Sequence, residues 1–206
     1  MPIELWISLV SICLLGAMSP GPSLAVVLTA TLGHGRGGGY RAALAHGVGV
    51  GLYGLLTVTS LALLITRTPT LYLALQLAGA AYLVYLGQAL LRSPGGSIDS
   101  DSGAGAANPW TAGFLVAFLN PKLAVFMLAL FSQFLQPEFG VREKSIMVAT
   151  VGITDACWYA LVTRIISQAT LFDYLKRNAQ RIDQLFGVVL ILLAASVVLN
   201  SAGLFG

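Results

Sequence analysis

The chain is built from six long apolar runs separated by short polar stretches. A helix needs about 20 mostly apolar residues to cross the hydrocarbon layer of a membrane, and each run is long enough and poor in charge. The runs lack the alternation of apolar and polar residues that is typical of a membrane β-barrel. We therefore predict an all-α integral membrane protein with six transmembrane helices. The runs cover residues 3–32, 41–66, 70–91, 109–134, 145–169 and 184–203.

The composition agrees with a lipid environment. Hydrophobic residues make up 57% of the 206 residues and charged residues only 9%, which is more apolar than a soluble domain of this length requires for its core. The net charge of +3 follows from basic residues in the loops and requires no nucleic-acid partner.

The distribution of basic residues predicts an orientation. Lys and Arg near span ends are retained in the cytoplasm, and the first, third and fifth loops hold six of them against three in the opposite loops. We therefore expect these loops inside and both termini outside the cytoplasm. The six are Arg36, Arg41, Arg92, Lys176, Arg177 and Arg181, and the three are Arg67, Arg142 and Lys144.

A change of composition divides the chain into two halves. Residues 93–108 are rich in Gly, Ser, Ala and Asp, and such a segment buries too little apolar area to offset its ordering entropy. We predict a flexible cytoplasmic linker between a half at 1–92 and a half at 109–206. Three spans in each half place the halves in opposite senses, so we expect an inverted repeat of the kind found in secondary transporters.

Proline motifs interrupt the first and fourth runs at matching places. Ser19-Pro20-Gly21-Pro22 and Asn120-Pro121-Lys122 have their central prolines 101 residues apart. Proline removes a backbone donor and disturbs the preceding turn, so both helices should break. Freed backbone groups in a bilayer must be buried in protein or line a wet cavity, where helix ends hold ionic groups. A plain kink is the alternative for one break, but two matched breaks favour a substrate-binding site.

Two charges lie near the middle of apolar runs. Lys122 in the fourth run and Asp155 in the fifth each cost roughly 3 kcal/mol or more at that depth, so they should face the bundle interior. We expect them to share one polar cavity. An ion pair that only fixes helix packing is the alternative.

These residues suggest a carrier mechanism. Burial and a nearby cation act in opposite senses on a carboxylate, so Asp155 can bind and release a coupling proton as the cavity opens to either side, or contact a substrate amine. Lys122 and the broken helix ends near Pro20 and Pro121 would hold a carboxylate. His46 either anchors its helix at the interface or joins the proton path.

Three further features leave alternatives open. Trp158 and Tyr159 follow Asp155 on its side of the helix and fit either a gate or ordinary packing. Gly47 and Gly51 have the spacing that lets helices approach closely, which serves an internal contact, a moving interface or a homodimer. The chain has two histidines and no Cys/His cluster, so we predict no metal site. We also predict no cofactor.

Short motifs follow one another along nearly the whole chain. They are Ser19-Pro20-Gly21-Pro22, Gly79-Ala80-Ala81-Tyr82-Leu83 with Leu86-Gly87, Asn120-Pro121-Lys122 with Phe126 and Phe131-Ser132-Gln133-Phe134, Asp155, and Phe186-Gly187. The ordered set resembles the LysE/RhtB family of amino-acid exporters. The resemblance implies a six-helix carrier of the bacterial inner membrane that expels amino acids or close derivatives by exchange with protons, with both proline breaks functional.

Two positions depart from the family pattern. Ser132 stands where relatives often have Pro, which should soften the end of the fourth helix less than usual. His46 is not part of the pattern, so the substrate class stays open.

Competing functions find less support in the residues. A metal-ion or other small-cation exporter of the same superfamily needs several deep acidic, His or Cys ligands, and only Asp155 is deep enough. An enzyme needs a nucleophile with a base, which the sequence does not offer. An amino-acid-like zwitterion is the expected cargo because the predicted cavity offers both a cation and an anion.

Overall fold

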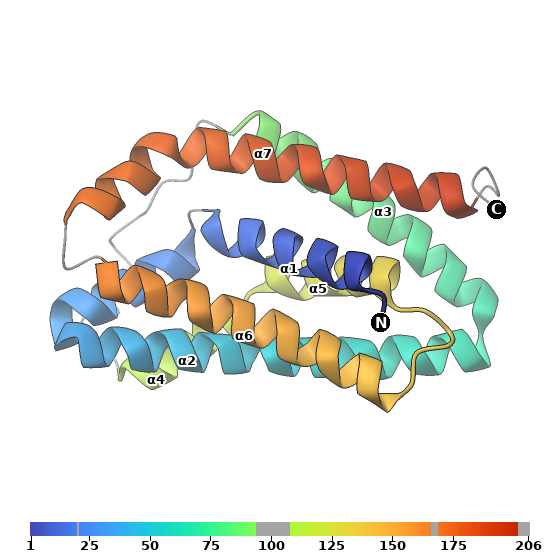
Figure 1. Cartoon of the computed structure of the whole chain (residues 1–206), viewed down its shortest axis with the longest axis horizontal. Helices are drawn as coiled ribbons and strands as arrows, with labels where there is room; N and C mark the ends of the chain where they lie inside the picture. The colour runs from blue at the N-terminus through green and yellow to red at the C-terminus, as the bar shows by residue number, and fades with distance from the viewer. Residues whose placement is uncertain (20, 94–107, 166–168, 202–206) are drawn as a thin grey trace.

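Seven helices account for most of the residues that the structure describes. The computed structural model describes all residues except 20, 94–107, 166–168 and 202–206. Figure 1 shows the helices lying along one long axis, and the described residues contain no strand. The helices are α1 (Ile3–Met18), α2 (Pro22–Arg67), α3 (Pro69–Leu91), α4 (Pro109–Phe118), α5 (Pro121–Phe134), α6 (Val141–Ile165) and α7 (Ala169–Ser201).

Both predicted interruptions fall between helices. α1 ends at Met18 and α2 begins at Pro22, with Pro20 outside the described residues. α4 and α5 are bent by 58° at their junction. Pro121 opens α5 and Pro22 opens α2, where a missing backbone N–H costs nothing because the first turn has no intrahelical acceptor for it.

The polar stretch between the first two predicted runs, residues 33–40, is mostly helical. Only His34 and Gly35 leave helical geometry, and Gly35 has a φ of 68° that glycine adopts without strain. Gly37, Gly38 and Gly39 continue α2, and the last two are closely packed. Side chains at Gly38 and Gly39 would collide with His34 and Thr163 respectively.

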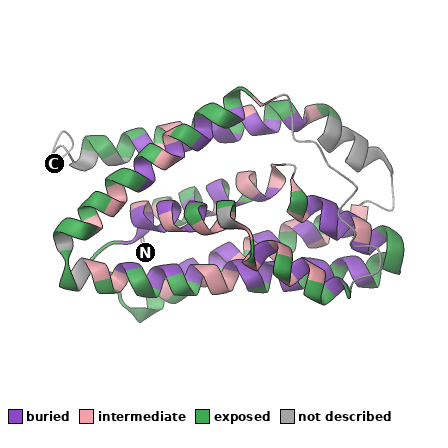
Figure 2. Cartoon of the chain, turned by 180° about the vertical axis from the view of Figure 1, so that it is seen from behind, coloured by how far each residue is buried: buried purple, intermediate pink, exposed green. Residues whose placement is uncertain are grey.

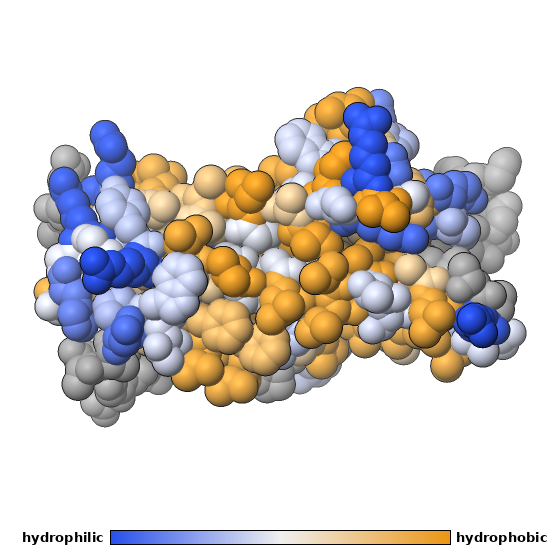
Figure 3. Space-filling model, turned by 90° about the horizontal axis from the view of Figure 1, so that it is seen from below, coloured by the Kyte–Doolittle hydropathy of each residue, from blue (hydrophilic) through white to orange (hydrophobic). Residues whose placement is uncertain are grey.

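The described helices are apolar enough to cross a membrane. Four stretches qualify by length and composition, and the bent pair α4–α5 makes a fifth when counted as one span; α1 is a shorter apolar helix of 16 residues. The four are Pro22–Leu64, Thr70–Leu91, Val141–Ile165 and Arg177–Ser196. Large apolar side chains such as Leu32, Leu119 and Leu192 lie exposed, and Figure 3 shows a hydrophobic band across the middle of one face, with hydrophilic residues toward both ends.

Helix α2 packs along α6, and helix α3 packs along α7. We call these the two helix pairs. Glycines make both crossings possible. A Cβ atom on Gly47 would lie 2.6 Å from Ala156 Cβ, and one on Gly87 would lie 2.7 Å from the Gly187 carbonyl oxygen. The Gly47 spacing noted in the sequence therefore serves a contact within the chain. Figure 2 shows the buried residues on the inward faces of the helices.

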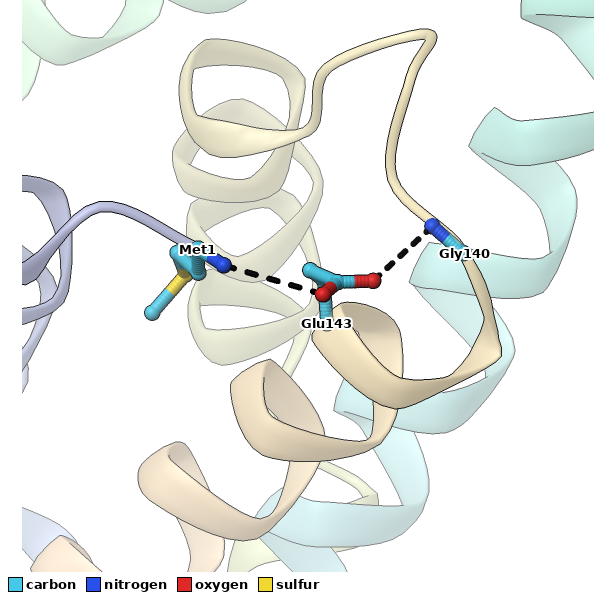
Figure 4. A network of polar contacts seen from close by, with 3 residues as sticks. All are labelled: Met1, Gly140 and Glu143. Atoms are coloured by element: carbon cyan, nitrogen blue, oxygen red, sulfur yellow. Dashed lines mark hydrogen bonds and ion pairs between the residues drawn. The ribbon is translucent and has the colours of Figure 1, made fainter.

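The turn between the two parts of α2, the end of α6 and the start of α7 gather at one end of the molecule (Figure 1). The N-terminus and the α5–α6 connection lie toward the opposite end. There Glu143 fixes the start of α6, because its Oε2 accepts the Gly140 N–H at 3.0 Å and its Oε1 lies 3.7 Å from the Met1 amino group (Figure 4).

Candidate functional site

A cavity of about 140 Å³ lies where the two breaks meet the helix pairs. Residues from α1, α2, α3, α5, α6 and α7 line it, together with the connections at both breaks. The cavity therefore brings together segments that are far apart in the sequence. Of the residues predicted to bind substrate, those that line it are Gly21, Pro22, Asn120, Lys122 and Asp155.

A close polar contact between a histidine and an aspartate forms one wall. The His46 Nδ1 lies 2.5 Å from Asp155 Oδ2, and both residues are buried, with exposed fractions of 2% and 9%. The Gly47–Gly152 crossing of α2 and α6 permits this short distance, because it brings the two backbones together beside the pair. His46 is thus an interior residue, which excludes interfacial anchoring.

The second ring nitrogen of His46 is buried and has no hydrogen-bond partner among the described residues. The Tyr159 ring meets the imidazole edge-on, with the ring centroids 4.9 Å apart. An unpaired polar atom in such a place is costly. The cavity that His46 lines offers room for a group that satisfies it.

The break between α4 and α5 supplies polar groups to another wall. The Asn120 side chain accepts the Leu123 N–H at 3.2 Å and so caps α5. The Tyr53 hydroxyl donates to the Phe118 carbonyl at 2.6 Å, which satisfies a backbone group at the end of α4. The N-terminus of α5, with its partial positive charge, is thereby fixed at the cavity.

Lys122 lines the cavity but is an exposed residue. Within the described part of the chain, the carboxylate of Asp155 pairs with His46 and not with Lys122. The two charges that the sequence predicted to share a cavity do line the same one, without a direct contact between them. A cation and an anion on separate walls leave space for a ligand that carries both charges.

The break between α1 and α2 contributes Ser19, Gly21, Pro22 and Ser23 to the lining. The N-terminus of α2 therefore also begins at the cavity. Pro20, the remaining residue predicted at this site, lies outside the described residues. For Pro121 the structure describes only the backbone, which opens α5.

Apolar side chains complete the cavity. Phe126 and Phe186 meet edge to face with ring centroids 5.9 Å apart, and Leu86, Met127 and Val50 line the cavity beside them. Phe186 also covers Gly16 of α1, where a Cβ atom would lie 3.2 Å from its ring. A ligand here would meet charged groups on two walls and an apolar surface between them.

The two aromatic residues that follow Asp155 point to different places. Tyr159 is buried and lines the cavity. Trp158 instead lines an apolar groove between α1 and α6, with Trp6 and Cys157. Residues three and four positions along a helix differ by about 100° in direction, so only the second faces the same side as the carboxylate of Asp155.

The sequence analysis missed one buried carboxylate. Asp183 of α7 is 2% exposed and accepts hydrogen bonds from Ser19 and Ser93. It precedes the sixth apolar run by one residue and follows Arg181, so it looked like part of a loop. Its spacing of three residues from Phe186 was the available signal, because it places both residues on one helix face.

Comparisons with known proteins find similar membrane and efflux proteins. An uncharacterised membrane protein of Pseudomonas aeruginosa is 28% identical over 174 residues, which cover 73% of this chain and 81% of the relative. The leucine efflux protein of Salmonella typhimurium is 30% identical over 188 residues, with 85% and 86% covered. The homoserine/homoserine lactone efflux protein of the same organism is 30% identical over 141 residues, with 67% and 68% covered.

No solved structure matches the chain. The LysE type translocator family, however, matches residues 14–201, which include every residue of the cavity described above except Cys13. That match covers far more than half of the chain, and it agrees with the apolar helices and the polar cavity between them. The chain is a membrane protein that belongs to the LysE type translocator family.

Proposed function

We propose that the chain exports amino acids or close derivatives from the cytoplasm by exchange with protons. Family membership makes it a translocator and not an enzyme. The observation that carries the proposal is the single cavity in which Lys122 and two helix N-termini face the His46–Asp155 pair. A zwitterion matches this arrangement of charges.

The carboxylate of the cargo would bind at the breaks. Both α2 and α5 begin at the cavity, and helix N-termini carry partial positive charge that favours anions. Lys122 adds a full positive charge beside Asn120. This is the use of broken helices expected in a secondary transporter.

The ammonium group of the cargo would bind near Asp155. A proton held by the His46–Asp155 pair and an ammonium group compete for the same negative charge, so binding of one disfavours the other. That competition is the physical requirement for antiport. His46 Nε2, buried and unpaired among the described residues, gives the pair a polar atom that can meet cargo or water.

The names of the relatives support an amino-acid cargo. Relatives that share 30% identity with this chain are called leucine and homoserine/homoserine lactone efflux proteins. The apolar wall of Phe126, Phe186 and Met127 suits an uncharged side chain. We therefore place neutral amino acids first among the cargoes to be tested.

An inverted repeat would explain how access alternates. Gly47 faces Gly152 and Gly87 faces Gly187 across the two crossings, and these pairs are separated by 105 and 100 residues, close to the 101 residues between the two proline breaks. Equivalent residues meet in this way near a pseudo-two-fold axis. In this arrangement α1 with the start of α2, and α4 with α5, are the broken first and fourth of six spans.

Transport into and out of proteoliposomes tests the proposal. Preloaded labelled leucine or homoserine should leave faster when the outside is made acidic, because inward proton flow drives outward cargo. A protonophore should remove the acceleration. Efflux that ignores the gradient would contradict antiport, and flux of divalent metal ions alone would support a metal exporter.

Substitutions at the two charges make the test specific to this cavity. Lys122→Ala and Asp155→Asn should each reduce gradient-driven efflux by about tenfold or more, because each removes a charge that a buried cargo group requires. Lys144→Ala, at the start of α6, and Glu138→Gln, in the α5–α6 connection, are matched controls outside the cavity lining. Normal efflux by both cavity variants would exclude this site.

A further inference from the structure

Asp183 joins three segments of the chain at the edge of the cavity. Ser19 Oγ donates to its Oδ1 at 2.6 Å and Ser93 Oγ donates to its Oδ2 at 3.1 Å. Ser19 lies at the break after α1, Ser93 lies two residues after the end of α3, and Asp183 belongs to α7. A buried ionisable residue within an apolar helix is costly, so its partners and position call for a functional explanation.

The hydrogen bonds connect two helix pairs at a place where α1 packs less on α7 than on α6. α3 and α7 form one pair through the Gly87–Gly187 crossing, whereas α1 packs mainly on α6, which forms the other pair with α2. The bond from Ser19 therefore crosses between the two helix pairs. The bond from Ser93 stays with α3 and α7 and orients the carboxylate.

On each side of the Ser19–Asp183 hydrogen bond, one residue lines the cavity. Ser19 lines the cavity itself. Phe186 lies one helical turn after Asp183, lines the cavity and rests on Gly16 of α1. A displacement of α7 relative to the break would therefore move the Phe186 ring across the cavity.

We propose that Asp183 is a positioning residue that holds α7 and α3 against the broken end of α1 in the access state seen here. The inference rests on the proposed function, because it assumes a carrier that alternates between two access states. A bond made in one state and lost in the other favours the first state by the energy of that bond. In this proposal the Ser19–Asp183 bond breaks when the cavity changes the side to which it opens.

The chain carries its own reporter of cavity access. Cys13 is buried, lines the cavity and is one of two cysteines, the other being Cys157 in the groove between α1 and α6. In a Cys157→Ser background, a membrane-impermeant thiol reagent can be applied from either side, to inside-out and right-side-out vesicles. The ratio of the two Cys13 labelling rates then measures the balance between access states.

Removal of the Ser19–Asp183 bond should change this ratio. Hydrogen bonds to charged groups are strong enough that Ser19→Ala should shift the ratio by about tenfold. The two rates should change in opposite directions. Ser93→Ala should shift the ratio less, because its bond is longer and lies within one helix pair, and Asp183→Ala should shift it at least as far as Ser19→Ala.

A matched control separates positioning from general loosening. Ser11 of α1 is exposed, and its hydroxyl donates only to the Ile7 carbonyl of the same helix at 2.8 Å, so Ser11→Ala should leave the ratio unchanged. An unchanged ratio in Ser19→Ala would overturn the proposal. So would an equal rise of both rates, because that result indicates a loosened fold and not a shifted balance.

The labelling does not require cargo, so the two proposals can fail separately. A shifted ratio in a protein that carries no amino acid would support the positioning role and contradict the proposed cargo. Amino-acid efflux with an unshifted ratio would support the cargo and contradict the positioning role. Size-exclusion profiles identical to the parent protein would establish that Ser19→Ala is folded.

Discussion

At the scale of single residues, the proposed exchange of cargo for protons depends on the His46–Asp155 pair. Both residues are buried, and the His46 Nδ1 lies 2.5 Å from Asp155 Oδ2. They line the cavity together with groups that suit the two ends of a zwitterion. Imidazole is the side chain that exchanges protons most readily near neutral pH. Coupling and cargo binding can therefore be separated by a side chain that keeps the hydrogen bond but carries no exchangeable charge.

His46→Asn is that substitution. The asparagine amide nitrogen takes the place of the imidazole Nδ1 and can still donate to Asp155, so exchange of labelled for unlabelled cargo at equal concentrations should continue. Efflux driven by a pH gradient should fall by about tenfold, because the pair no longer takes up a proton on the imidazole. Both rates can be measured in the same proteoliposomes.

His34→Asn is the matched control, since His34 is the other histidine of the chain and is exposed at the turn within α2. It should leave both rates unchanged. Gradient-driven efflux by His46→Asn at the rate of the parent protein would show that coupling does not pass through His46.

Candidate site residues could be predicted from the sequence where a single property of the residue marks it as unusual in a membrane helix. Lys122 and Asp155 stand out because charge is rare in apolar runs, and the breaks stand out because proline disrupts helices. The partners of these groups could not be predicted, because they depend on contacts between distant segments. His46 meets Asp155 across 109 positions and Ser19 meets Asp183 across 164.

At the scale of helices, glycine controls how closely α2 and α6 approach. Gly47 contacts Gly152 and Ala156 so closely that even one methyl group has no room, whereas a Cβ atom on Gly51 would lie 3.9 Å from its nearest neighbour. Both glycines belong to the same helix and the same spacing motif. They therefore form a matched pair for a substitution test.

Gly47→Ala should destabilise the fold by about 1–3 kcal/mol, because overpacking forces the helices apart. The same separation should lengthen the bond between His46 and Asp155 and reduce gradient-driven efflux. Gly51→Ala should be tolerated in both respects. Thermal unfolding in detergent and efflux from proteoliposomes provide the measurements, and equal unfolding temperatures for the two variants would contradict the packing argument.

The apolar runs predicted the approximate positions of the helices. They did not predict which helices continue through the polar stretches between runs. The glycines at 37–39 lie in the polar stretch between the first two predicted runs, yet two of them are needed where α2 packs against its own preceding turn and against Thr163 of α6. Composition alone does not distinguish glycine that bends a chain from glycine that admits a neighbour. Residues 94–107, which include most of the predicted linker, lie outside the described residues, so that linker stays a prediction.

At the scale of the whole molecule, the two ends differ in charge. The turn at His34–Gly35 with its neighbouring arginines lies at one end, and the α5–α6 connection lies at the other (Figure 1). Lys and Arg are retained on the cytoplasmic side of a membrane. The structure thus turns the distribution of loop charges into a definite prediction of orientation.

Single cysteines placed at the two ends test that orientation. In a background with Cys13 and Cys157 replaced by serine, His34→Cys and Glu138→Cys each introduce a thiol at an exposed position. An impermeant thiol reagent added to whole cells should label the second variant and not the first, and disruption of the membrane should make both reactive. The reversed pattern would place the arginine-rich end outside and contradict the orientation predicted from the loop charges.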